Sequence, residues 1–139
     1  MNTLSFKIIT PDRTVYEDEV KQVTIPTSSG EITVLAHHTP LVSLLIVGEV
    51  RVEKPDGARL SFFVNQGIVE VRKDNALYLL TDLAQPASEI NIEEAEKARA
   101  QAEKMLSKGD KLVKEDFAHF EGELARELAK IKIGSRQRG

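Results

Sequence analysis

The spacing between apolar residues changes near residue 85 of this 139-residue chain, and the change divides the chain into two parts. Up to about Asp82, apolar residues alternate with polar ones, a period of two that places one set of side chains on the buried face of β-strands. The alternating apolar residues are Leu4, Phe6, Ile8, Val23, Ile25, Ile32, Val34, Val50, Val52, Leu60, Phe62, Val64, Val69, Val71, Leu77 and Leu79. Turn signals interrupt the alternation at residues 11–12, 28–30, 55–57 and 73–75. Short strands at this spacing predict an antiparallel β-sandwich over residues 1–84.

A Gln-Pro-Ala-Ser segment follows the last alternating run and predicts a linker over residues 85–90, because proline ends a strand and small residues come after it. Residues 91–139 then follow the spacing of helices. Asn91 can cap a first helix, with Glu94 at the capping-box position. The apolar stripe of this helix comprises Ile92, Ala95, Ala98, Ala102 and Met105.

The two helices are predicted to form an antiparallel hairpin. Gly109 is expected to end the first helix and Asp110 to cap the second, which leaves a loop of a few residues. The stripe of the second helix comprises Val113, Phe117, Phe120, Leu124, Leu128 and Ile131. Because the first stripe is mostly alanine, the contact buries little area, and at about 25 cal/mol per Å² the gain is modest. We therefore expect a weakly held hairpin that can move.

Composition excludes several classes of protein. The chain contains no cysteine, so disulfides, thiolate metal sites and thiol catalysis are excluded. A net charge of −3 and 5% aromatic residues argue against nucleic-acid binding. No apolar run approaches the roughly 18 residues of a membrane helix, and the N-terminus lacks the apolar core of a signal peptide. Any association with a membrane is therefore expected to be peripheral.

The sequence offers no catalytic constellation, and neither a metal nor a cofactor is expected. It has no phosphate-binding glycine loop, nucleophile elbow, zinc-protease motif or EF-hand. His37 and His38 are neighbours that point in opposite directions if extended, and residues 17–19 are interpreted as a solvated acidic edge. Basic residues gather near the end of the chain at Arg126, Lys130, Lys132 and Arg136. They are either a solvated helix end or an electrostatic handle for an acidic partner.

Several strings, in order along nearly the whole chain, resemble the epsilon chain of bacterial and chloroplast-type ATP synthases. The strings are ITPD and VY within residues 9–16, SGEI at 29–32, HTPL at 38–41, GEVRV at 48–52, GIVEV at 67–71, TDLA at 81–84 and an Ile-x-x-x-x-Ala helix opening at 90–95. Thr33, Ala36 and His37 stand where the family usually has glycine, proline and glycine. Asn65 or Gln66 replaces one glycine of a usual pair. The lost glycines predict altered turns.

The resemblance implies a non-catalytic accessory subunit, a rotor component in the central stalk of a proton-translocating ATP synthase. Its sandwich would contact the gamma subunit and the ring of membrane c subunits. The residues implied at these contacts are Glu31, His38, Thr39 and Pro40. The hairpin would either fold on the sandwich or extend into the alpha/beta catalytic head and inhibit ATP hydrolysis, with the four basic residues near acidic segments. The implied location is peripheral, on the cytoplasmic face of a bacterial plasma membrane, or on the stromal side of a thylakoid.

Some members of the family bind ATP through an I-D-x-x-R-A motif at the start of the first helix. The matching positions here are Ile90, Asn91, Glu94 and Ala95. Asparagine replaces the aspartate, and glutamate replaces the arginine that would form charge-assisted hydrogen bonds with a polyphosphate. The alternative function is a regulatory module that binds a small ligand such as a nucleotide. The two substitutions argue against it, and we expect weak or absent ATP binding.

Overall fold

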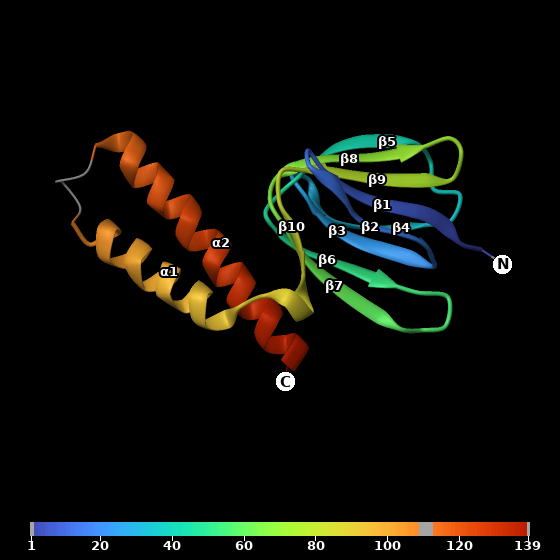
Figure 1. Ribbon diagram of the computed structural model, residues 1–139. Coiled ribbons are helices and arrows are strands. Elements are labelled where there is room, and N and C mark those ends of the chain that lie inside the picture. Colours follow the sequence, from blue (N-terminus) through green and yellow to red (C-terminus); the bar gives the residue numbers. More distant parts are fainter. Residues whose placement is uncertain (1, 109–112, 139) are drawn as a thin grey trace. The chain divides into compact units, whose positions relative to one another are not determined.

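The computed structural model describes residues 2–108 and 113–138 and divides the chain into two compact units, Met1–Pro86 and Ala87–Gly139 (Figure 1). The strands of the first unit are β1 (Leu4–Thr10), β2 (Arg13–Val20), β3 (Gln22–Thr27), β4 (Gly30–Leu35), β5 (Leu41–Leu45), β6 (Gly48–Glu53), β7 (Arg59–Val64), β8 (Gly67–Arg72), β9 (Ala76–Thr81) and β10 (Ala84–Pro86). The second unit contains a 3₁₀ turn, η1 (Ala87–Glu89), and the helices α1 (Ile92–Leu106) and α2 (Lys114–Arg138). The predicted fold class, a β-sandwich followed by two helices, is confirmed.

The ten strands form one sheet. Nine of them follow the hydrogen-bonded path β10-β7-β6-β3-β5-β8-β9-β1-β2, and β4 pairs with β3 off this path. All pairs are antiparallel except one. β1 and β9 run parallel, from the Ser5–Ala76 pair to the Ile9–Leu80 pair. This one pair departs from the predicted antiparallel arrangement, because alternation in a sequence does not reveal which distant strand pairs with the first one.

The core of the first unit is made by the alternating residues. All sixteen are buried except Ile32 and Leu60, which are half-buried. The Tyr16 ring lies between the rings of Phe6 and Phe62, with centroids 5.9 and 5.0 Å away. Burial, together with the Asp18 carboxylate, raises the pKa of Tyr16 to about 12. Its hydroxyl therefore stays protonated and can donate to Asp18 Oδ2, at 3.2 Å.

Asn75 connects three segments at one end of the sandwich. Its side chain donates to the carbonyl oxygen of Thr3 at 2.8 Å and accepts from the backbone N–H of His37 at 2.7 Å. Both Asn75 and His37 have positive φ, 61° and 63°. Asparagine and histidine enter this left-handed conformation more often than most residues, but for any residue other than glycine it still costs free energy. His37, which stands where the family usually has glycine, thus has a backbone conformation that glycine adopts without strain.

Replacing His37 with glycine is expected to stabilise the first unit. Relief of the left-handed strain, about 1–2 kcal/mol, exceeds the entropy that glycine adds to the unfolded chain, about 0.5–1 kcal/mol. Denaturant unfolding should show a net gain of about 0.5–1 kcal/mol. His38→Gly is the matched control, because His38 has no positive φ and should lose stability instead. Equal effects of the two substitutions would contradict the argument.

Secondary structure extends into the segment where the sequence predicted a linker. Gln85 and Pro86 belong to β10, in which Gln85 pairs with Phe63 and Pro86 with Phe62. Proline is compatible with this place because β10 is the last strand of the path, where only one edge pairs with another strand. Residues 87–89 form η1.

Helix α1 begins where the sequence predicted. The side chain of Asn91 caps it by accepting a hydrogen bond from the backbone N–H of Glu94, at 3.0 Å. Ala95 and Ala102 of the predicted stripe are buried, and Ile92, Ala98 and Met105 are half-buried. The predicted helix stop at Gly109 and cap at Asp110 lie outside the described residues.

Helices α1 and α2 lie side by side and antiparallel (Figure 1). Near the end of α2, a Cβ added to Gly134 would lie 3.2 Å from side-chain carbons of Ile90 and Ile92, at the start of α1. Glu127 lies seven residues before Gly134, on the same helical face, and is buried. The predicted stripe is therefore only partly covered: Val113, Phe117 and Leu128 stay exposed. The alanines of α1 form a narrower surface than the bulky apolar stripe of α2, so they cover only one side of that stripe.

Candidate functional site

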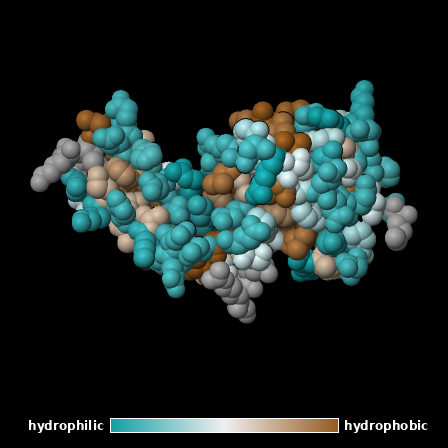
Figure 2. Space-filling view, viewed as in Figure 1, coloured by the Kyte–Doolittle hydropathy of each residue, from teal (hydrophilic) through white to brown (hydrophobic). Residues whose placement is uncertain are grey.

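An apolar band lies exposed on the first unit, over β5 and β8. Val42 and Leu44 are 72% and 61% exposed, and Ile46 and Ile68 are 43% exposed. Figure 2 shows hydrophobic surface gathered in this region, at the top of the view. Leu41 and Leu45 alternate with the first two and face the other way, so β5 is apolar on both sides. Such a strand is expected when one of its faces is covered by a partner.

Strand register extends the band across the sheet. Leu44 pairs with Ile68, Ile68 with Leu80, and Leu80 with Ile9. This row joins β5, β8, β9 and β1, and a groove lined by Ile68 and Leu80 continues from it toward the turns. The alternation of apolar and polar residues does not predict this band. The signal that could have found it is the unbroken apolar run at residues 44–47, which interrupts the alternation.

Charged and aromatic side chains border the apolar band. The Arg72 guanidinium lies over the Tyr78 ring, 3.8 Å from its centroid. Its Nε donates to Glu70 Oε1 at 2.7 Å, and this hydrogen bond raises the pKa of Arg72. Tyr78 pairs with Glu70 on β8 and with Lys7 on β1, so these groups form a row next to the apolar one. An apolar centre with a polar rim is the usual anatomy of a protein interface.

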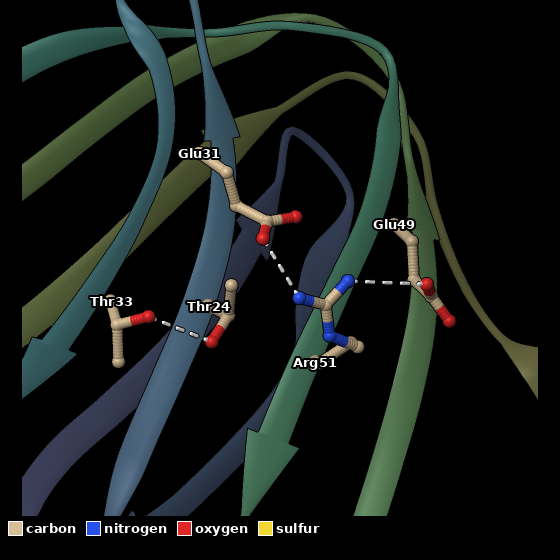
Figure 3. A network of polar contacts seen from close by, with 5 residues as sticks. All are labelled: Thr24, Glu31, Thr33, Glu49 and Arg51. Carbon is tan, nitrogen blue, oxygen red and sulfur yellow. Dashed lines mark hydrogen bonds and ion pairs between the residues drawn. The ribbon is translucent and has the colours of Figure 1, made fainter.

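Glu31, one of the residues implied at a subunit contact, is held by an arginine from another strand. Arg51 Nη2 donates to Glu31 Oε1 at 2.9 Å, and Arg51 Nη1 lies 3.6 Å from Glu49 Oε1 (Figure 3). The hydrogen bond to Glu31 raises the pKa of Arg51. The Glu31 side chain is still 54% exposed. A fixed but accessible carboxylate results.

His38, Thr39 and Pro40 lie at the other end of β4 from Glu31. Most of β4 separates the two places, because the four steps from Glu31 to Leu35, at about 3.3 Å each, span roughly 13 Å. His38 Nδ1 lies 2.7 Å from the carbonyl oxygen of Thr39, which orients the imidazole ring locally. A partner that contacts both places must therefore extend along the sandwich.

The four basic residues of α2 form two pairs. Arg126 and Lys130 are four residues apart and share one face, as do Lys132 and Arg136. The two pairs are about 120° apart around the helix at 100° per residue. Lys130 Nζ also lies 3.5 Å from Glu127 Oε2. The two basic pairs therefore lie on different faces of α2, and the four residues do not form a single basic patch.

The residues that match the ATP motif lie at the N-terminal end of α1. Asn91 is the helix cap, Ile90 and Ala95 are buried, and Glu94 is exposed in the first turn. A carboxylate at this position repels a polyphosphate, although the helix N-terminus itself favours anions. Isothermal titration calorimetry is expected to give a dissociation constant for ATP above about 1 mM. Glu94→Arg should bind ATP more tightly. Tight, saturable binding by the unmodified chain would contradict the prediction.

Within residues 2–108 and 113–138, no group of three or more His, Asp or Glu side chains could hold a metal ion. Across the same ranges, no helix is long and apolar enough to cross a membrane. A β-sandwich with an uncovered apolar band, joined to a pair of helices, defines a class of protein that is built to contact other chains.

Comparisons with known proteins identify the family. The model of the ATP synthase delta/epsilon chain β-sandwich domain matches residues 3–87, and that of the long α-helix domain matches residues 88–134. The ATP synthase epsilon chain of Halalkalibacterium halodurans is 38% identical over 136 residues, which are 98% of this chain and 100% of the relative. That of Delftia acidovorans is 34% identical over 131 residues, or 94% of this chain and 93% of the relative. The chain therefore belongs to the ATP synthase delta/epsilon family, among its epsilon chains.

Solved structures agree with the fold. A chain of the Euglena gracilis mitochondrial ATP synthase has a TM-score of 0.78 at 24% identity, covering 96% of this chain and 81% of that one. A chain of the Tetrahymena thermophila mitochondrial ATP synthase has a TM-score of 0.66 at 13% identity, covering 94% and 96%. Both combine the same elements over nearly the whole of this chain.

Proposed function

We propose that this chain is a non-catalytic rotor subunit in the central stalk of a proton-translocating ATP synthase, which links the catalytic head to the c-ring and inhibits ATP hydrolysis through its helices. Family membership supports the place in the complex. The two solved chains come from assemblies described as F1/c-ring and central stalk. The proposed location is peripheral, on the cytoplasmic face of a bacterial plasma membrane.

The observation that carries the proposal is the apolar band of Val42, Leu44, Ile46 and Ile68. Four large apolar side chains on adjacent strands, each 43% exposed or more, need a protein partner to remove them from water. In the proposed complex this partner is a gamma-type subunit. Glu31 and the segment of His38, Thr39 and Pro40 would make further contacts, to gamma or to the ring, at separate places along β4.

The hairpin is the proposed inhibitory element. Its first helix offers mostly alanine to the second, and Phe117 and Leu128 of α2 keep 39% and 46% of their surface exposed. The uncovered part of this apolar stripe can gain contacts by binding the alpha/beta head. Because the two helices bury little surface against each other, moving them to a second position would not require breaking a large core. The basic pairs Arg126/Lys130 and Lys132/Arg136 would then face acidic segments on two sides.

Leu44→Glu is expected to weaken assembly by at least about thirtyfold, because a central apolar contact is lost and a carboxylate enters a dry interface. The measurement is the dissociation constant of fluorescently labelled chain for an ATP synthase lacking its own epsilon chain. Leu44→Met is the matched control and should bind like the unmodified chain. Since Leu44 is 61% exposed, neither substitution should change thermal stability much. Unchanged binding of the glutamate variant would refute this interface.

A further inference from the structure

Arg51 reaches across a strand to hold Glu31. The register places Arg51 of β6 opposite Thr24 of β3, and Thr24 opposite Thr33 of β4. Glu31 pairs with Pro26, one step further along the same face. The contact between Arg51 and Glu31, drawn as a dashed line in Figure 3, therefore runs diagonally to the rows of paired residues.

The neighbours of the guanidinium fix its direction. Glu31 Oε1 accepts from Nη2 at 2.9 Å, and Glu49 Oε1 lies 3.6 Å from Nη1, so one planar fork spans two carboxylates. On the row beside it, the Thr24 and Thr33 hydroxyls share a hydrogen bond of 3.1 Å. A lysine could not satisfy both carboxylates with the same fixed geometry. The arrangement restricts the rotamers of Glu31.

Stability alone does not account for this arrangement. The Arg51 and Glu31 side chains are 44% and 54% exposed, and ion pairs at such exposure contribute little to folding. Only one oxygen of Glu31 is used: within the described ranges, Oε2 makes no side-chain hydrogen bond. The carboxylate is therefore held at one oxygen, while more than half of the Glu31 side chain stays exposed.

We propose that Arg51 is a positioning residue for Glu31: it occupies Oε1 and orients Oε2 toward a hydrogen-bond donor, an amide or a cation, on the subunit that Glu31 contacts. The inference rests on the proposed function, in which Glu31 lies at a contact with the ring or with gamma. Holding the carboxylate before binding removes the entropic cost of ordering a long side chain at the interface. Arg51 itself then acts through Glu31 and not by touching the partner.

A double-mutant cycle tests the proposal. The dissociation constant for ATP synthase lacking its own epsilon chain is measured with the full chain and with Glu31→Gln, Arg51→Gln and the double variant. We expect each single substitution to weaken binding about five- to tenfold, and the double variant to bind no more weakly than Glu31→Gln. Arg51→Lys should recover part of the loss. The unfolding temperature, which is measured in parallel, should stay nearly constant across the set.

Two outcomes would overturn the inference while leaving the Glu31 contact intact. One is normal binding by Arg51→Gln while Glu31→Gln binds weakly. The other is a further loss when Arg51→Gln is added to Glu31→Gln, which would mean that the arginine touches the partner directly. If Glu31→Gln binds like the unmodified chain, the Glu31 contact of the proposed function fails first, and the inference fails with it.

Discussion

Gly67→Ala is expected to destabilise the first unit by at least about 3 kcal/mol, at the upper end of ordinary overpacking effects. A Cβ at this position would lie 1.9 Å from the carbonyl oxygen of Leu80 and 3.0 Å from the Cα of Thr81. Both atoms belong to the backbone of β9, which is held between β8 and β1 and cannot retreat without losing ladder hydrogen bonds. A domain stable by 5–15 kcal/mol would lose a large share of its stability.

Chemical denaturation followed by circular dichroism measures this effect. Gly122→Ala is the matched control, because the nearest atom to its added Cβ is Arg126 Nη1 at 3.6 Å and the helix gains propensity. That variant should be more stable by up to about 1 kcal/mol. A Gly67→Ala protein that unfolds at the same denaturant concentration as the unmodified chain would show that the β8–β9 approach is looser than the structure indicates.

Ending the chain at Pro86 is expected to raise ATP hydrolysis by the assembled complex at least about fivefold, the lower end of common coupling energies between sites. The second unit, Ala87–Gly139, carries the proposed inhibitory helices, and the first unit keeps all ten strands. Assembly should therefore be unaffected. Steady-state ATPase activity and co-purification with the complex are the two measurements.

A chain ending at Leu83 is the informative control for this truncation. It also lacks β10, so β7 loses the partner that pairs with Val64, Phe63 and Phe62. This variant should fold less stably and assemble less well. Failure of the Pro86 truncation to assemble would make the helices structural, and unchanged ATP hydrolysis in an assembled complex would remove the inhibitory role.

Local features of the fold could be predicted from the sequence because they depend on neighbouring residues. The alternation of Leu4, Phe6 and Ile8 reflects strand geometry, and all three are buried. The cap at Asn91 depends on the residue three positions later and forms as expected. Gly67 was visible as part of a family string, and the structure adds the reason for it, which is the backbone of Leu80.

Features that depend on distant residues could not be predicted in the same way. Helical spacing defines the apolar stripe of α2. It does not define which side of the stripe the alanines of α1 cover, so Leu128, a member of the stripe, remains 46% exposed. The Arg51–Glu31 contact depends on the registers of β4 and β6 against β3. The apolar band was missed because alternation identifies buried faces and gives no signal for a face that a second protein covers.

The parallel pairing of β1 with β9 has a consequence for how the chain is made. β1 leaves the ribosome well before β9, its parallel neighbour, which is synthesised about 70 residues later, as the Ser5–Ala76 pair shows. Contacts between such distant residues form late. Until β9 has emerged, β1 can therefore pair with β2 but not with β9, and the sandwich closes afterwards. The helices, whose hydrogen bonds are local, can form as soon as they appear.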